Sequence, residues 1–585
     1  MAPRRLLQWL FTILFSLIGL SLLIIALLPF GKFQMVLNLL SRDGTLTMLR
    51  SDNAYVFRYL LGMVILGIGG LAYLTAMKEW NKLLDLVKQL WRDFRTFLSF
   101  SNSLRSEWGF LVLMLIVMAL AFIRRLALIE RPISHDEAYT VVTFADTIFH
   151  AMTDYTLPNN HVFHTILVNL SIKTLGLEPW TARLPAFLAG VLIVPGVYFL
   201  AKRIYDQWTA ILASVLVAFS PSLIDYSTTA RGYILVTLFS LIILILGYYA
   251  SKKRNLVTWG LISVFSALGL YTVPVMLFPF GILFVWLFLE NMLVRSAAYS
   301  SKWEFLKYWL ASGFFAALLT LLLYTPIQIY TGPQLLFENG FIAPMPWRDL
   351  LPTLLTRIIG TWAEWVKGIP LAILIVLGAG WVLSLIFHRK LSTIHTPLQV
   401  ASFLWITILL IVQRPNALPK VWVFLLPLML IWSAAGIVGL MRNVHIKPLY
   451  DLSLAGVVVG VVLLVGLVSS IELVPKIPAL LAQRGDVEST VLFLKNNINQ
   501  TDLIVVDSPE DSPVWFYALE HDINNIHFDK RIPFTRAWVL VSPRFDQTVE
   551  SVVADRGPDI PALDLASKKL IQQIGSVQIF ECPIK

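Results

Sequence analysis

Two neighbouring carboxylates, Asp136 and Glu137, are the first residues in this sequence whose types and spacing could carry out chemistry. They belong to a short polar stretch, residues 131–139 (RPISHDEAY), which follows the apolar run of residues 108–123. A charged pair beside a membrane span is costly to place there and is often functional. Two carboxylates can divide acid–base work, because one of them can be held ionised as a proton acceptor. A solvated loop pair would have the same sequence, so the dipeptide alone leaves both interpretations open.

A group of cations is predicted on the same side of the membrane as this pair. The group comprises Arg183, Arg231, Arg414 and Lys420. Short loops outside the cytoplasm disfavour Lys and Arg, so several of them together need a reason. A lipid phosphate at membrane level supplies one, because Arg binds phosphate through two parallel hydrogen bonds. Snorkelling of these side chains toward lipid headgroups is the alternative interpretation.

Three histidines share the loop with the acidic pair. They are His135, His161 and His164, and the last two have the i,i+3 spacing that places both rings on one face of a helix. Together with the carboxylates, such a face could hold a divalent metal ion. Histidines that form hydrogen bonds or contact a substrate would show the same spacing, so both possibilities stay open.

The elements that must position these residues are membrane helices. The chain has 585 residues, of which 57% are hydrophobic and 14% charged, and its mean hydropathy is +0.73. A soluble globular protein of this composition could not cover its surface with polar groups. The net charge of +10 does not indicate nucleic-acid binding, because most Lys and Arg lie in short loops between spans, where they set topology. Cys582 is the single cysteine, which excludes an internal disulfide.

Apolar runs predict thirteen transmembrane helices. They cover residues 6–31, 55–77, 108–123, 184–201, 209–224, 232–250, 257–271, 275–288, 308–327, 370–387, 398–412, 421–440 and 452–471. Basic clusters at residues 202–203, 252–254, 295–307, 389–390 and 442–447 then fall on one side, which the positive-inside rule makes cytoplasmic.

This topology requires that residues 141–175 do not cross the membrane, although they are apolar. We expect them to form helices at the extracytoplasmic surface. Residues 78–105 place apolar side chains at helical spacing among basic ones. This pattern predicts an amphipathic helix on the cytoplasmic membrane surface, with an ordinary packed helix as the alternative.

The chain divides into three predicted parts. Residues 1–107 form an N-terminal extension with two spans and the amphipathic helix. Residues 108–474 form a transmembrane catalytic domain with extracytoplasmic loops at residues 124–183 and 329–368, the second a proline- and tryptophan-rich cap. Residues 475–585 form a small extracytoplasmic α/β domain, because helical and strand patterns alternate there. Its expected elements are helices at 486–497, 513–521, 547–556 and 565–574, and strands at 502–507, 537–541 and 576–580.

The order of these features resembles the GT-C class of membrane glycosyltransferases, most closely the protein O-mannosyltransferase-like group that includes the lipid A aminoarabinose transferase. The resemblance covers about residues 108–440. It is carried by residues 136–139 (DEAY), 158–161 (PNNH), 181–190 (TARLPAFLAG), 198–203 (YFLAKR), 220–226 (SPSLIDY), 230–233 (ARGY) and 419–427 (PKVWVFLLP). The proline pair usual in the first loop of the family is absent here, and the chain also lacks the tryptophan-tryptophan-aspartate signature of oligosaccharyltransferases.

The resemblance implies a polytopic GT-C fold and transfer of a hexose or pentose from a polyprenyl monophosphate to an extracytoplasmic protein, lipid or glycan, with inversion at the sugar. It implies that Asp136, with Glu137 beside it, is the catalytic base. It also implies that Arg183, Arg231, Lys420 and Arg414 hold the donor phosphate. The residues expected to contact sugar or acceptor are His135, Tyr139, Asn160, His161, His164 and Tyr233.

Two other functions remain open at this point. A polymerase or ligase of lipid-linked glycans would use the same cations and histidines without needing Asp136. A transporter of lipids or sugars would show internal repeats and ionisable residues near mid-membrane, and the sequence shows no clear repeat. All three functions place the chain in the plasma (inner) membrane among lipids, with a cytoplasmic N-terminus. None needs nucleic acid, and no cofactor is required, although a divalent metal is possible.

Overall fold

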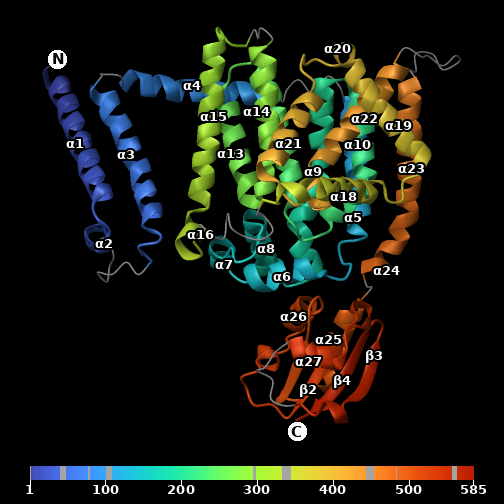
Figure 1. Cartoon of the computed structure of the whole chain (residues 1–585). Coiled ribbons are helices and arrows are strands. Elements are labelled where there is room, and N and C mark those ends of the chain that lie inside the picture. The colour runs from blue at the N-terminus through green and yellow to red at the C-terminus, as the bar shows by residue number, and fades with distance from the viewer. Residues whose placement is uncertain are drawn as a thin grey trace.

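The computed structural model describes residues 2–39, 48–76, 80–99, 108–293, 298–332, 344–442, 454–481, 484–555 and 563–584. A bundle of apolar helices dominates these residues, and a small unit of helices and strands lies at one end of it (Figure 1). The helices of the bundle are α5 (Trp108–Leu126), α9 (Pro179–Ile204), α10 (Gln207–Phe219), α11 (Pro221–Ser227), α12 (Tyr233–Lys252), α13 (Leu256–Thr272), α14 (Leu277–Met292), α15 (Lys302–Leu323), α19 (Leu371–Ile386), α21 (Leu398–Gln413), α22 (Leu425–Met441) and α23 (Leu454–Leu473).

Each of the thirteen predicted spans contains a helix of the structure. Length and composition alone identify seven helices among the described residues that could cross a membrane, or up to nine if each bent pair is one span. Shorter apolar helices, such as α13 and α22, account for the other predicted spans. The polytopic helical fold is confirmed, and the count of thirteen spans stays a prediction.

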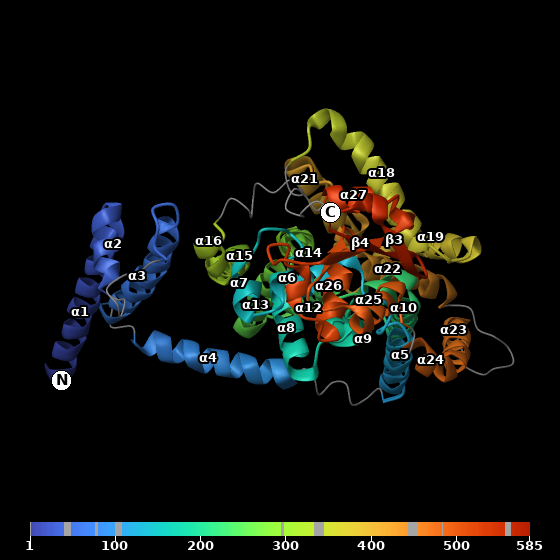
Figure 2. The same cartoon turned by 90° about the horizontal axis from the view of Figure 1, so that it is seen from below.

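The first helices stand beside the bundle. They are α1 (Ala2–Leu27), α2 (Phe30–Asn38) and α3 (Ala54–Ala76), and Figure 2 shows α4 (Trp80–Ser99) reaching from them to the bundle. Asp93 of α4 accepts a hydrogen bond from the Leu256 backbone N–H at 2.8 Å, so α4 meets the start of α13. Trp91 and Phe94 on α4 are exposed. An exposed apolar face on a basic helix fits the predicted membrane-surface position.

Basic residues gather at this same end of the bundle. The Lys252 ammonium donates to the Thr393 carbonyl oxygen at 2.9 Å, and the Thr393 hydroxyl donates to the Arg203 carbonyl oxygen at 2.6 Å. The chain therefore brings three of the predicted basic clusters together, as a common cytoplasmic side requires. Residues 294–297 and 443–450, which carry part of the two remaining clusters, lie outside the described residues.

The opposite end of the bundle carries the helices of the first loop. They are α6 (His135–Phe144), α7 (Ile148–Thr153) and α8 (Val162–Leu175), and they lie beneath the bundle in Figure 1, next to the short α16 (Thr325–Tyr330). α18 (Trp347–Val366) forms most of the described part of the predicted second cap and is bent by 115° against α19. The short helices α20 (His388–Leu391) and α24 (Ile477–Leu481) complete the set.

The C-terminal unit is a four-stranded sheet with helices. It consists of α25 (Asp486–Asn497), β1 (Asp502–Val506), α26 (Asp511–Glu520), β2 (Arg536–Val541), α27 (Val549–Asp555), β3 (Lys569–Ile574) and β4 (Val577–Pro583), with strand order β1-β2-β4-β3. β1 and β2 are parallel with Ile504 opposite Trp538, and the other pairs are antiparallel. A small sheet with helices was predicted here and is confirmed.

One element of this unit was predicted wrongly. Residues 565–574 were expected to be a helix, but they form a short 3-10 turn followed by strand β3. β3 is an edge strand with mostly exposed side chains, so its sequence lacks the alternating burial that marks a strand. Its partner is set by the tight turn at Gly575, whose φ of +53° favours glycine.

The C-terminal unit packs directly on the first loop. Ile133, Ala138 and Val168 share one hydrophobic cluster with side chains of α26 and β4. The Ile133 backbone N–H also donates to the Tyr517 hydroxyl at 3.1 Å. α6 is therefore covered by the bundle on one side and by α26 on the other.

Candidate functional site

The start of α6 is fixed by its own sequence. Ser134 is the N-cap, and the Glu137 carboxylate accepts hydrogen bonds from the Ser134 backbone N–H at 3.0 Å and from the Ser134 hydroxyl at 2.9 Å. A glutamate three residues after a serine N-cap satisfies N–H groups that the helix itself cannot. This contact turns Glu137 inward and leaves Asp136 on another side of the helix.

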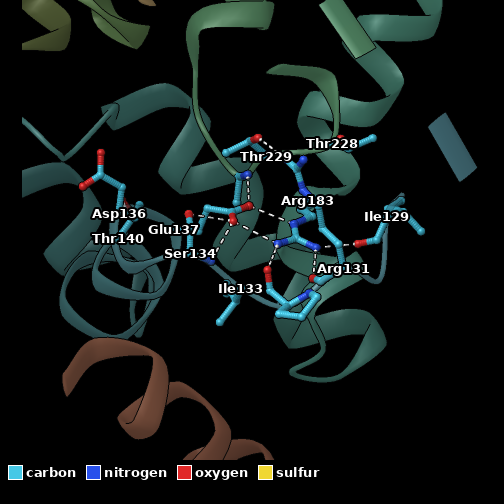
Figure 3. A network of polar contacts seen from close by, with 12 residues as sticks. Ile129, Arg131, Ile133, Ser134, Asp136, Glu137, Thr140, Arg183, Thr228 and Thr229 are labelled. Carbon is cyan, nitrogen blue, oxygen red and sulfur yellow. Dashed lines mark hydrogen bonds and ion pairs between the residues drawn. The ribbon is translucent and has the colours of Figure 1, made fainter. Parts of the chain in front are cut away.

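Glu137 and Arg183 form a buried ion pair (Figure 3). Arg183 Nε donates to Glu137 Oε1 at 2.8 Å, and Nη2 donates to Oε2 at 2.9 Å. Nη1 of Arg183 donates to the carbonyl oxygens of Ile129 and Arg131, and Nη2 also donates to that of Pro132. The five N–H groups of the guanidinium thus all have protein acceptors.

The same carboxylate reaches a third segment of the chain. The Ala230 backbone N–H donates to Glu137 Oε1 at 2.6 Å. Burial alone would raise the pKa of Glu137, but Arg183 and these N–H donors outweigh it and lower the pKa to about 2. Glu137 is therefore ionised and committed to holding α6, α9 and the turn before Arg231 together.

Asp136 points away from this network, as Figure 3 shows, and meets two other cations. Its Oδ2 lies 3.6 Å from Arg231 Nη2 and 3.5 Å from Lys420 Nζ. The Asp136 side chain is 45% exposed, whereas that of Arg231 is 5% exposed. Burial alone would raise the pKa of Asp136, but the charges of Arg231 and Lys420 lower it below its ordinary value. The carboxylate is ionised at neutral pH.

Arg231 is buried and is oriented by several long hydrogen bonds. Its Nη1 donates to the Thr140 hydroxyl at 3.2 Å, and its Nη2 donates to Asn159 Oδ1 at 3.4 Å. The Arg231 guanidinium and the Lys420 ammonium lie 5.9 and 6.0 Å from the centre of the Tyr233 ring. Cations over an aromatic face are attracted by it, so Tyr233 keeps both charges at one place.

These cations line a cavity of about 530 Å³, which we call the Arg231–Lys420 cavity. Its wall is formed by the start of α14, the end of α21 and the 3-10 helix Pro419–Trp422. Most of its lining is apolar and includes Val273, Leu277, Phe278, Val412 and Val421. An apolar cavity with two cations in its lining suits a ligand with an anionic head and a hydrocarbon tail.

Comparison with known proteins places this geometry on a known fold. The family model described as dolichyl-phosphate-mannose-protein mannosyltransferase matches residues 162–306. The crystal structure of ArnT from Cupriavidus metallidurans in the apo state superimposes with a TM-score of 0.50 and 12% identity, over 81% of this chain and 98% of that one. The chain has the GT-C fold. The resemblance predicted from the sequence motifs is thereby confirmed at the level of the fold.

Two further solved structures are similar to this chain. ArnT bound to undecaprenyl phosphate gives a TM-score of 0.50 with 13% identity, over 81% of this chain and 98% of that one. The oligosaccharyltransferase AglB from Archaeoglobus fulgidus, in complex with an inhibitory peptide and a dolichol-phosphate, gives 0.42 with 11% identity, over 75% of this chain and 70% of that one. No curated protein sequence matches the chain significantly.

The remaining predicted cations lie differently in this GT-C fold. Arg183 is fully buried in the Glu137 network, away from the Arg231–Lys420 cavity. Arg414 ends α21 with a φ of +45°, donates to the Met345 carbonyl oxygen at 2.9 Å, and lies 4.9 Å from the Trp347 ring. Arg414 therefore holds the start of α18 beside the cavity, whose lining includes its neighbours in the sequence.

The three predicted histidines have different surroundings. His161 is buried, and its Nδ1 accepts from the Gly232 backbone N–H at 2.8 Å. Burial and the nearby Arg231 hold the pKa of His161 well below its ordinary value, so the ring is neutral. Neither ring nitrogen of buried His164 has a partner among the described residues. Within those residues, no group of three His, Cys, Asp or Glu side chains could hold a metal ion.

Three other predicted contact residues have structural partners. Asn160 Nδ2 donates to the carbonyl oxygens of Ala151 and Asp154, which closes the loop before α8. His135 Nδ1 lies 3.0 Å from the Pro509 carbonyl oxygen, so it contacts the C-terminal unit. Tyr139 lines a second cavity between α6 and that unit.

Three residues at the site had no predicted role: Asn159, Thr140 and Gly232. Asn159 lies in the quoted motif of residues 158–161, and Thr140 follows Asp136 by one helical turn, so a helical-wheel argument could have found it. A Cβ on Gly232 would lie 2.7 Å from Thr272 Cγ2 and 3.1 Å from His161 Cβ. Glycine is therefore needed where the chain passes between these two side chains just after Arg231.

Proposed function

We propose that this protein is a membrane glycosyltransferase that takes a sugar from a polyprenyl monophosphate donor and transfers it to an acceptor outside the cytoplasm. One observation carries the proposal: the Asp136 carboxylate is paired with Arg231 and Lys420, two cations that line an apolar cavity. The GT-C fold, the matching family model and the ArnT structure bound to undecaprenyl phosphate support it. A polyprenyl phosphate has the anionic head and apolar tail that suit this cavity.

The pairing of Asp136 suggests how donor binding activates the base. The donor phosphate needs Arg231 and Lys420 and therefore competes with Asp136 for them. When phosphate takes both cations, Asp136 loses the charges that lower its pKa, while its partial burial still raises it. A carboxylate with a higher pKa is a better proton acceptor. The base would thus become active only when the donor is in place.

The transfer step then follows from these positions. Asp136 takes the proton of an acceptor hydroxyl, whose oxygen attacks the anomeric carbon as the bond from that carbon to the phosphate oxygen breaks. The electron pair of that bond stays on the phosphate. Arg231 and Lys420 stabilise the charge that develops there. Direct attack inverts the anomeric configuration, and the polyprenyl phosphate leaves as the second product.

Glu137 and Arg183 have a positioning role in this proposal. They hold the turn of residues 129–132 against the backbone of residue 230, which directly precedes Arg231. The catalytic base and its cation thus come from two segments tied by one buried ion pair. Arg414 would act in the same way, by positioning α18 beside the cavity.

The topology belongs to the same proposal. The basic end of the bundle and α4 would face the cytoplasm, while α6 and the C-terminal unit would lie outside the plasma (inner) membrane. The parts remain those predicted: an extension over residues 1–107, a catalytic domain over 108–474 and an acceptor-side α/β domain over 475–585.

A sugar-transfer assay with purified protein tests the function. Full-length protein in detergent is given a panel of polyprenyl-phosphate sugars with an envelope glycolipid extract as acceptor, and released polyprenyl phosphate is measured. Release that requires both acceptor and Asp136 supports the proposal. Release that survives Asp136→Asn would favour a polymerase or ligase. Donor binding without any release, together with movement of the lipid across vesicles, would favour a transporter.

A further inference from the structure

A second cavity lies between α6 and the C-terminal unit. It has a volume of about 590 Å³ and is enclosed by α6, β1, α26 and the residues after α26, and we call it the interdomain cavity. Tyr139, Val142 and Thr143 of α6 line it. Asp136 and Thr140, which meet Arg231, lie on the adjoining face of the same helix. The two cavities thus border neighbouring faces of one short helix.

Aromatic side chains in the interdomain cavity are presented to solvent. Trp515 is 40% exposed, and its indole N–H donates to Asn525 Oδ1 at 3.3 Å, which fixes the orientation of the ring. Tyr139 and Phe528 contribute two more half-buried rings. Three aromatic rings at one cavity offer a ligand apolar faces on which it can stack.

The charges of the cavity balance one another. Asp511 and Asp529 contribute two carboxylates, and Lys530 and Arg531 contribute two cations. Arg531 is also paired with Asp529 at 2.9 Å. A strongly charged ligand would meet equal attraction and repulsion here, in contrast to the Arg231–Lys420 cavity. Hydroxyl and amide groups of Thr143, Ser512 and Asn525 add neutral hydrogen-bonding sites.

A sugar matches this combination of surfaces. One face of a pyranose ring carries C–H groups that pack on an aromatic ring, and its edge carries hydroxyls that donate to carboxylates and accept from amides. We propose that the interdomain cavity binds a neutral saccharide, which forms the recognition portion of the acceptor. The assignment of this saccharide to the acceptor rests on the proposed glycosyl transfer. Saccharide binding to the cavity does not depend on it.

The first turn of α6 offers the route between the two cavities. His135 borders the interdomain cavity, with its ring centre 6.0 Å from that of Tyr139 and its Nδ1 3.3 Å from Asp511 Oδ1. Asp136 follows directly and is 45% exposed. A saccharide seated on Trp515 and Tyr139 would extend past His135 to place a hydroxyl at Asp136.

The test measures saccharide binding and donor binding separately on full-length protein in detergent. Mannotriose, cellotriose and chitotriose serve as probes, and binding is measured by calorimetry. We expect one of them to bind with a Kd of about 1 mM and Trp515→Ala to weaken that binding about tenfold. Trp515→Phe should restore most of it. Undecaprenyl phosphate binding should not change in any of these variants.

Trp303→Ala is the matched control, because Trp303 is an exposed tryptophan at the start of α15 and does not line the interdomain cavity. Equal weakening by Trp303→Ala, or no binding of any trisaccharide to wild type, would overturn the inference. So would tighter binding of an uncharged peptide than of every trisaccharide. If trisaccharides bind through Trp515 but no donor is bound or cleaved, the proposed function fails while the saccharide site stands.

Discussion

Replacing Asp136 by asparagine should separate binding from chemistry. The substitution keeps the shape of the side chain and removes its charge and basicity. Loss of a positioned proton acceptor lowers transfer by about 100- to 10,000-fold. Polyprenyl phosphate binding should move in the opposite direction, because the cations that hold the phosphate lose their competitor.

The size of the binding effect follows from the geometry. Asp136 Oδ2 lies 3.6 Å from Arg231 and 3.5 Å from Lys420, but the carboxylate is 45% exposed and solvent weakens both pairs. After that screening, the two pairs together contribute about 1 kcal/mol. The phosphate no longer has to displace this interaction in the variant, so its Kd should fall about fivefold.

The assay compares undecaprenyl phosphate binding and single-turnover sugar transfer for the wild type and the variant. Asp225→Asn is the control, since Asp225 is an exposed carboxylate that pairs with Arg131 outside the cavity lining. It should change neither quantity by more than about twofold, because exposed ion pairs contribute little. Weaker phosphate binding by Asp136→Asn would refute the competition argument. Transfer at the wild-type rate would refute the role of Asp136 as base.

Four further outcomes are expected. Glu137→Gln should lower the free energy of unfolding by about 3–5 kcal/mol, because it leaves buried Arg183 without its charge partner. A thermal melt in detergent that matches that of wild type would contradict this. Because the pKa of Glu137 is lowered to about 2, the stability that this residue contributes is present above its ordinary pKa of 4.5 and is lost as pH falls toward 2. The free energy of unfolding of Glu137→Gln should therefore depend less on pH between those values than that of wild type. Parallel pH dependences would exclude this linkage. Burial and the nearby Glu178 raise the pKa of Glu520, so the packing of α26 on the first loop is favoured at low pH and weakens as pH rises through the raised value. Limited proteolysis should release the C-terminal unit faster at alkaline pH, and Glu178→Gln should reduce that difference; equal rates would argue against it. Gly232→Ala should weaken polyprenyl phosphate binding, because the added Cβ displaces the turn beside Arg231. Gly260→Ala is the control and should not weaken binding, because a Cβ at that position meets open space. Equal effects of the two variants would contradict the need for glycine at position 232.

The membrane fold and the position of Asp136, Arg231 and Lys420 at one end of the bundle could be predicted from the sequence. Both depend on long apolar runs and on which ends of those runs carry charge, and such patterns are local in the sequence. Asp136 and Lys420 are almost 300 positions apart, but they could be assigned to the same end of the bundle because each lies next to the corresponding end of a predicted span.

The division of work between Asp136 and Glu137 could not be predicted in this way. Adjacent residues on a helix point about 100° apart, so one of the two must turn away from the cavity. The cap at Ser134 decides which one, and the fully occupied guanidinium of Arg183 depends on carbonyl oxygens that the sequence does not reveal. The interdomain cavity likewise depends on how α26 docks on α6, a contact between segments more than 350 residues apart.

The network around Glu137 also decides where this chain could be cut and joined to another protein of the same fold. Its carboxylate accepts hydrogen bonds from the loop before α6, from Arg183 early in α9 and from the backbone N–H of residue 230. If a graft of the first loop ended before Arg183, Glu137 would come from this chain, but its arginine partner would come from the other protein. A junction placed after Gly232 would carry the whole network, together with Arg231, as one exchangeable module. Hybrid proteins intended to swap acceptors should therefore be joined inside α12 and not at the end of the loop.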